Sequence, residues 1–216
     1  MISVLIADDH TIVRQGLRSL LEGSTDIRVV GEAGDGRQAI ERAEELQPDV
    51  VVMDVAMPGL NGLEATREIR KRFPQIRVLA LTMHRDPQYA VRLLQAGAAG
   101  YLLKDSAKEA LLAALEAVMR GETFLSPEVS RQVLDVYDRH GEAAAARSPF
   151  DTLTTREREI LQRIAEGYTS RQIAGQLGIS AKTVNNHRAR IMDKLNIRDI
   201  AGLTRFAVQN GLIQAE

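Results

Sequence analysis

The chain has 216 residues, 44% of them hydrophobic, a length at which two small domains are more common than one large one. It contains no cysteine and no apolar run near the roughly 18 residues of a membrane span, which excludes a disulfide framework, a thiolate zinc site and a transmembrane helix, and we expect a cytoplasmic protein. The formal net charge is −1, yet residues 151–216 carry 10 Lys or Arg against 7 Asp or Glu, a modest excess that favours nucleic acid as a partner of this end.

In the first 125 residues, short β-branched apolar runs alternate with segments of helical periodicity. This pattern is typical of βαβ units around a parallel sheet, and we expect such a domain over residues 1–121. The predicted strands are Ser3–Ala7, Arg28–Ala33, Val50–Asp54, Val78–Thr82 and Gly100–Leu103. The predicted helices cover residues 11–22, 37–46, 62–72, 87–96 and 107–120.

Residues 122–150 are predicted to be a linker. Ser126-Pro127-Glu128 has the composition of a helix start, with a capping serine and a proline at the first helical position. From Gly141 on, the small and polar residues cannot bury much surface, which indicates a flexible connector. Residues 151–216 read as helical throughout and form the second predicted domain.

Reactive side chains stand at the ends of four predicted strands. Asp8 and Asp9 follow the first strand, Asp54 ends the third, Thr82 ends the fourth and Lys104 follows the fifth. Because open α/β sheets bind ligands at the carboxyl ends of their strands, these side chains are expected to share one pocket. Three carboxylates would repel one another unless a hard divalent cation lay among them, and Mg²⁺ is the cofactor we expect.

Asp54 is the predicted nucleophile of this pocket. A carboxylate can attack a phosphoryl group to give an aspartyl phosphate. Asp8 and Asp9 would hold Mg²⁺, Lys104 would pair with one phosphate oxygen, and the Thr82 hydroxyl would donate to another. Each residue alone is explained more simply as a turn, strand or solvated residue, and only their joint placement favours the site.

The strand-end residues and their neighbours resemble the motif set of a receiver domain. The set comprises Asp8-Asp9, Asp54, Met57-Pro58-Gly59, Thr82, Tyr101 and Lys104. The resemblance covers residues 1–121 and implies a flavodoxin-like α/β fold, with a parallel five-stranded sheet in the order 2-1-3-4-5. It also implies phosphorylation of Asp54 by a sensor histidine kinase and a switch in which Thr82 and Tyr101 reorient.

Ala56 is the residue of the pocket that departs from the usual receiver pattern. The resemblance implies that its backbone carbonyl is a further Mg²⁺ ligand, beside Asp8, Asp9 and Asp54. Its side chain is small and apolar where many receivers have a larger or polar one. Since this side chain flanks the path of attacking water, the departure bears on the lifetime of the phosphoryl group and not on metal binding.

Residues 151–216 predict four short helices that include a helix-turn-helix. Thr154 would cap the first helix, and Ser170–Leu177 would form the second. Gly178-Ile179-Ser180 would make a tight turn and cap a third helix, Ala181–Leu195. The amide and basic side chains of this third helix suit base edges and phosphates, although a polar helix face is often only solvated.

A longer string of residues resembles a LuxR-type helix-turn-helix. It comprises Leu153-Thr154, Glu157, Glu159, Gly167, Ile173-Ala174, Ile179-Ser180, Lys182-Thr183-Val184, His187 and Lys194-Leu195. Together the two halves resemble the NarL/FixJ class of two-component response regulators. This resemblance puts Asn185, Asn186 and Ala189 at base-reading positions and Lys182 and His187 where phosphate contacts are usual. The full predicted set of DNA-contacting residues is Lys182, Thr183, Asn185, Asn186, His187, Ala189 and Arg190.

The fourth predicted helix, about Asp199 to Asn210, resembles the dimerisation helix of this class, although it could simply close the core. The class implies that the unphosphorylated receiver often covers the recognition helix, and that phosphorylation frees it and promotes a homodimer on double-stranded DNA. RNA polymerase is a candidate further partner.

Two other interpretations remain open. Phosphatases of the haloacid dehalogenase type also use a strand-end Asp, but they need a second acid two residues later, where this chain has Ala56. A constitutive DNA-binding regulator could instead use its receiver only for docking or dimerisation. The residues favour a phosphorylation-activated transcription factor over the constitutive regulator and over any enzyme.

Overall fold

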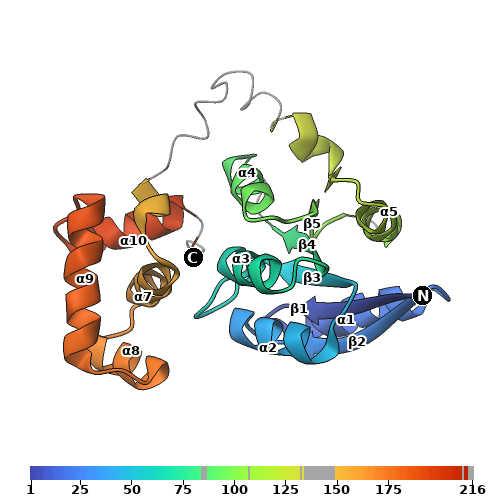
Figure 1. Ribbon diagram of the computed structural model, residues 1–216. Coiled ribbons are helices and arrows are strands. Elements are labelled where there is room, and N and C mark those ends of the chain that lie inside the picture. Colours follow the sequence, from blue (N-terminus) through green and yellow to red (C-terminus); the bar gives the residue numbers. More distant parts are fainter. Residues whose placement is uncertain (84–86, 107, 132, 134–148, 211, 214–216) are drawn as a thin grey trace. The chain divides into compact units, whose positions relative to one another are not determined.

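Figure 1 shows the computed structural model, which describes residues 1–216 except 84–86, 107, 132, 134–148, 211 and 214–216. The chain divides into two compact units, Met1–Gly141 and Glu142–Glu216. Among the described residues, none of the helices combines the length and the apolarity that a membrane crossing needs.

The first unit is built on a parallel sheet. Its strands run in the order β2-β1-β3-β4-β5-β6, and every neighbouring pair is parallel. Their bounds are β1 Ile2–Ala7, β2 Ile27–Ala33, β3 Val50–Asp54, β4 Arg77–Thr82, β5 Gly100–Leu103 and β6 Phe124–Leu125. The predicted fold class and the predicted order of the first five strands are confirmed.

Helices cover both faces of this sheet (Figure 1). They are α1 Thr11–Glu22, α2 Gly36–Leu46, α3 Gly62–Arg72, α4 Pro87–Gln95 and α5 Lys108–Met119. Alternate residues of a strand face opposite sides of a sheet. Val4 and Ile6 of β1 therefore join one apolar core with α1 and α5, while Leu5 and Ala7 join another with α2 and α3. Each of these ten predicted strands and helices agrees with the structure to within one residue at either end.

A sixth strand, β6, adds to the five that the sequence predicts. Gly100 and Tyr101 of β5 pair with Phe124 and Leu125, and the Ser126 N–H donates to the Tyr101 carbonyl at 3.1 Å. Two residues are too few to show the alternation by which a strand is recognised in sequence.

The chain continues from β6 into the predicted linker helix. Residues 127–131 are helical, and the Val129 side chain is buried. The remainder of the linker prediction, over residues 134–148, lies outside the described residues.

The second unit contains the four predicted helices, preceded by a short 3₁₀ turn, η2, at Pro149–Thr152. They are α7 Thr155–Ala165, α8 Ser170–Leu177, α9 Ala181–Leu195 and α10 Ile200–Gln209. Capping residues begin each helix, and reciprocal capping boxes at Thr154 and Glu157 and at Thr169 and Gln172 begin α7 and α8. Asn196, with a φ of 53°, ends α9 in the left-handed conformation.

Candidate functional sites

Carboxylates from β1 and β3 meet at the carboxyl edge of the sheet. Asp8 and Asp9 follow β1, Asp54 ends β3, and pairing of these neighbouring strands brings the two ends together. One ligand atom each of Asp8, Asp9, His10 and Asp54 lies within 4.8 Å of the others. Asp8 and Asp54 expose only 1% and 3% of their surface. The predicted acidic cluster is therefore assembled by the fold.

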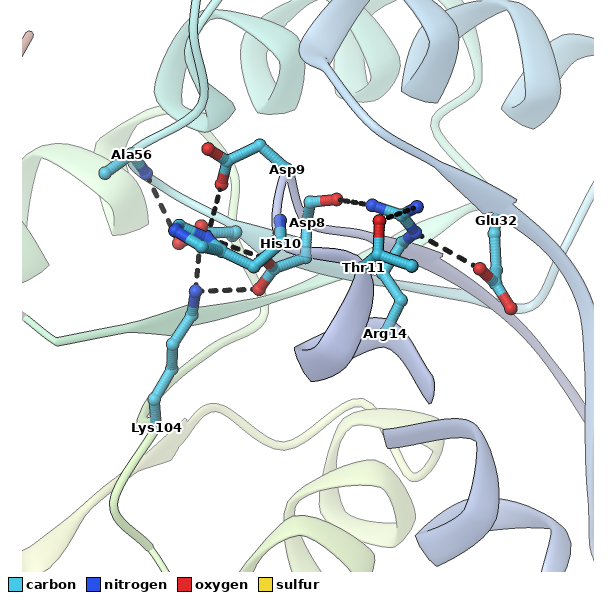
Figure 2. Close-up of polar contacts among 9 residues, drawn as sticks. Asp8, Asp9, His10, Thr11, Arg14, Glu32, Ala56 and Lys104 are labelled. Carbon is cyan, nitrogen blue, oxygen red and sulfur yellow. Dashed lines mark hydrogen bonds and ion pairs between the residues drawn. The ribbon is translucent and has the colours of Figure 1, made fainter. Parts of the chain in front are cut away.

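Lys104 lies between two of these carboxylates. Its Nζ is 2.7 Å from Asp8 Oδ2 and 2.8 Å from Asp54 Oδ2, and Figure 2 shows the side chain pointing into the cluster. Its backbone N–H donates to the Thr82 carbonyl at 2.8 Å, so the pairing of β4 with β5 sets its position.

Burial controls the charges of this pocket. Burial raises the pKa of Asp54, and the negative charge of Asp8 raises it further. The Lys104 ammonium group and the Ala56 N–H lower this pKa, but they offset the rise only in part. Burial also opposes the charged form of Lys104, but Asp54 and Asp8 outweigh it, so the pKa of Lys104 is raised and its ammonium group stays charged. One ammonium group against several carboxylates leaves an excess of negative charge. Carboxylate oxygens are the ligands that a hard divalent cation prefers, so the residues fit Mg²⁺.

His10 joins the pocket and Arg14 supports it from outside, and sequence reasoning missed both. The His10 N–H donates to Asp8 Oδ1 at 2.8 Å, and its Nδ1 lies 2.8 Å from Asp9 Oδ1. Arg14 Nη1 donates to the Asp8 carbonyl at 2.7 Å, while its Nε pairs with Glu32 Oε2 at 3.1 Å (Figure 2). His10 is adjacent to the motif and could have been noticed. Nothing local in sequence connects Arg14 on α1 with Glu32 on β2.

The loop after Asp54 is packed tightly against it. The Ala56 N–H donates to Asp54 Oδ1 at 3.3 Å, and the Gly62 N–H donates to the Val55 carbonyl at 2.9 Å. A Cβ atom at position 62 would stand 2.0 Å from the Asp54 carbonyl oxygen, so only glycine fits there. Gly59 has a φ of 76°, a backbone conformation that residues with a side chain rarely adopt.

The two predicted switch residues are fully buried. Thr82 ends β4 opposite Leu103, and Tyr101 on β5 lies opposite Ala80. Tyr89 of α4 is also buried, and burial together with the nearby Tyr101 raises its pKa. The aromatic side chain of Tyr101 is thus turned into the protein in this structure.

The polar face of α9 carries the predicted DNA-contacting residues. Val184 and Ile191 are buried and fix which face of the helix looks outward. The exposed members of the predicted set are Lys182, Asn185, Asn186, Ala189 and Arg190, and the half-buried ones are Thr183 and His187.

Thr183 has a structural role as well. Its N–H donates to the Ser180 hydroxyl at 3.0 Å, and the two hydroxyl oxygens are 2.8 Å apart. The far end of α9 is tied to α7 by Lys194, whose Nζ is 2.6 Å from Glu157 Oε2. Burial opposes the charged form of Glu157, but Lys194 and Thr154 outweigh this effect and lower its pKa.

Comparison with known families assigns both units. Residues 4–116 match the response regulator receiver domain, and residues 151–207 match the luxR family of bacterial regulatory proteins. The response regulator UvrY of Escherichia coli K12 is 39% identical over 216 residues, covering 100% of this chain and 98% of that protein. The chain belongs to the response-regulator family. It is a two-component response regulator with a LuxR-type DNA-binding domain, and the predicted NarL/FixJ resemblance is confirmed.

Other relatives of this response regulator agree with that assignment. The transcriptional regulatory protein DegU of Brevibacillus brevis is 36% identical over 225 residues, covering 99% of this chain and 95% of that protein. The solved structure of the response regulator RcsB of Salmonella typhimurium is 30% identical, with a TM-score of 0.58 over 96% of this chain and 98% of that one. An RcsB–DNA complex matches with a TM-score of 0.60 at 30% identity, over 97% of this chain and 98% of that one.

Proposed function

We propose that a sensor histidine kinase phosphorylates this response regulator on Asp54, and that phosphorylation controls the binding of α9 to double-stranded DNA. The observation that carries the proposal is the Asp54 carboxylate, which is buried at the end of β3 with Lys104 Nζ 2.8 Å from its Oδ2. A buried carboxylate beside a cation, at the edge where α/β sheets bind ligands, is equipped to accept a phosphoryl group.

In the proposed reaction an Asp54 oxygen attacks the phosphorus of a phosphohistidine. The new P–O bond forms as the P–N bond breaks, and the histidine nitrogen takes up a proton. Lys104 would turn its ammonium group to one phosphoryl oxygen, and Thr82 would donate its hydroxyl to another. Mg²⁺, held by Asp8, Asp9, Asp54 and the carbonyl of Ala56, would neutralise charge on the transferring oxygens.

For DNA binding, we assign base contacts to Asn185, Asn186 and Ala189, with Ala189 limited to apolar contact. Lys182, His187 and Arg190 would contact phosphates, which position the domain without reading sequence. Thr183, in the first turn of α9, would make a further contact with the DNA.

We further propose how the parts cooperate. Reorientation of Thr82 and Tyr101 would report phosphorylation, and a homodimer would form on activation. The receiver would span residues 1–121, the linker 122–150 and the DNA-binding domain 151–216. The protein would act in the cytoplasm, with RNA polymerase as a candidate further partner.

The test measures intact mass and DNA binding of the full-length protein with Mg²⁺ and acetyl phosphate. Wild type is expected to gain one phosphoryl group and to bind DNA more tightly, whereas Asp54→Asn gains neither. Asp26→Asn, which changes an exposed loop carboxylate, serves as the matched control. If Asp54→Asn still gained the phosphoryl group and the tighter binding, Asp54 would not be the acceptor.

The constitutive alternative predicts equal DNA affinity for wild type and Asp54→Asn under phosphorylating conditions. The assembled pocket argues against it, because a docking module needs neither three clustered carboxylates nor a half-buried lysine paired with two of them. A phosphatase of the haloacid dehalogenase type is disfavoured because Ala56 offers no carboxylate.

A further inference from the structure

One hydrogen bond joins the two helices of the helix-turn-helix through their side chains. The Ser170 hydroxyl, at the first residue of α8, donates to Asn185 Oδ1 of α9 at 2.7 Å. Asn185 is exposed, and Ser170 is half-buried. A proposed base-reading side chain is therefore held by a residue of the other helix before any DNA is present.

The start of α8 does not need this hydroxyl. Thr169 is the capping residue, and its hydroxyl accepts from the Gln172 N–H at 3.3 Å. Gln172 in turn accepts from the Thr169 N–H at 2.9 Å, which completes the capping box. Since the cap is provided by its neighbours, the Ser170 hydroxyl is left to contact Asn185.

The orientation of a carboxamide decides what it reads. Its oxygen accepts and its nitrogen donates, so a half-turn of the side-chain amide exchanges the two at a base edge. The N-terminus of α8 presents backbone N–H groups and the positive end of the helix dipole, which favour the oxygen of Asn185 on that side. The Ser170 hydroxyl adds a direct hydrogen bond to the same oxygen.

We propose that Ser170 is a positioning residue for base readout, because it holds the Asn185 carboxamide with its oxygen toward α8 and its nitrogen free for DNA. The nitrogen then donates to an acceptor on a base edge. Purines offer such an acceptor at N7 and thymine offers one at O4 in the major groove, whereas cytosine offers a donor at N4. The inference rests on the proposed DNA contact of Asn185 and adds that its base preference is set by Ser170.

The experiment selects duplexes from a randomised DNA pool with the full-length protein, Mg²⁺ and acetyl phosphate. Wild type is compared with Ser170→Ala, Ser170→Thr and Asn185→Ala, and the ratio of the best base to cytosine is measured at every position. Wild type is expected to disfavour cytosine at the position that Asn185→Ala relaxes. Ser170→Ala should reduce the ratio there by about threefold to tenfold, the effect of losing one intramolecular hydrogen bond. Ser170→Thr keeps the hydroxyl and should remain close to wild type.

Asp193→Asn is the control. Asp193 is exposed on the same helix and has no part in the proposed DNA contact. Its change should leave the preference at the position read by Asn185 unchanged.

Three outcomes would overturn the inference, and they are distinguishable. If Ser170→Ala weakened binding to all sequences alike, its hydroxyl would contact a phosphate and would not position Asn185. If Asn185→Ala relaxed one position while Ser170→Ala left that position unchanged, only the role of Ser170 would fall. If Asn185→Ala changed no base preference, both the proposed base contact of Asn185 and the positioning role of Ser170 would be wrong.

Discussion

The Lys104 ammonium group is the main compensation for buried negative charge in the receiver pocket. It lies within 2.8 Å of oxygens of both Asp8 and Asp54, and only 13% of its side chain is exposed. Removing one partner of a buried ion pair leaves the other uncompensated, which costs more than the pair itself contributes.

We therefore expect Lys104→Ala to destabilise the receiver by about 3 kcal/mol without Mg²⁺. The deficit should shrink when Mg²⁺ is added, since a bound cation would take over part of the compensation. Denaturant unfolding with and without Mg²⁺ measures both effects, with Lys71→Ala, an exposed lysine of α3, as the control. Equal stability of the Lys104 and Lys71 variants would contradict this account.

Arg14 affects the same pocket without entering it. Its guanidinium group connects the Asp8 carbonyl to Glu32, so it holds the backbone from which two proposed metal ligands project. Residues that orient metal ligands commonly change metal affinity by one or two orders of magnitude when they are removed.

Arg14→Ala is accordingly expected to weaken Mg²⁺ binding about tenfold, measured by calorimetric titration without a phosphoryl donor. Arg42→Ala provides the control, since Arg42 pairs with its exposed neighbour Glu45 on α2, away from the pocket. Unchanged Mg²⁺ affinity in the Arg14 variant would show that the contact is merely structural.

Among the elements, helix α3 tolerates no side chain at its first residue, Gly62. A Cβ there would stand 2.0 Å from the Asp54 carbonyl oxygen and 2.9 Å from the Val55 Cα, and backbone cannot move aside cheaply. Gly62→Ala should destabilise the receiver by about 3 kcal/mol. Gly16→Ala in α1, where nothing lies within 4 Å of the new Cβ, should instead stabilise it by about 0.5–1 kcal/mol. Thermal unfolding of both variants measures the two changes in stability. Similar changes of the same sign would contradict the claim that position 62 has no room for a side chain.

The contact between α7 and α9 is expected to depend on pH through Glu157. Since the pKa of Glu157 is lowered in the folded protein, its contribution to stability is present above about 4.3, the ordinary value, and is lost as the pH falls through the lowered pKa. In Glu157→Gln, the free energy of unfolding should fall less steeply as the pH is lowered through this range. Asp193→Asn, an exposed change in α9, should keep the wild-type slope. Matching acid limbs for wild type and Glu157→Gln would exclude this role.

For the molecule as a whole, charge is divided unequally between the two units. The net charge of −1 cannot attract DNA, so attraction must come from basic side chains gathered in residues 151–216. Lys182→Ala is therefore expected to weaken binding equally for all sequences and to reduce the salt slope of the affinity by about one per protomer. Binding measured over a salt series tests this, and a sequence-dependent loss would instead make Lys182 a base contact.

Much of the fold was predictable from the sequence because its signals are local. Helix α9 could be bounded because Ser180 caps its start and Asn196 ends it. Asp54 and Lys104 could be assigned to one pocket because parallel strands end at the same edge.

Three features could not be predicted because they are pairings between distant segments. Strand β6 is too short to show a pattern. The pairs Arg14–Glu32 and Ser170–Asn185 join different elements, and neither partner has a local signal that names the other.

The parallel pairing of β6 with β5 determines where the chain leaves the receiver. Tyr101 and Lys104 belong to β5 or follow it directly, and the Ser126 N–H donates to the Tyr101 carbonyl at 3.1 Å. The polypeptide that leaves the receiver is thus hydrogen-bonded through its own backbone to the strand that carries Tyr101 and directly precedes Lys104. We expect a displacement of β5 to move residues 124–126 with it, because their backbones are hydrogen-bonded, so that the covalent chain itself would carry the displacement into the linker.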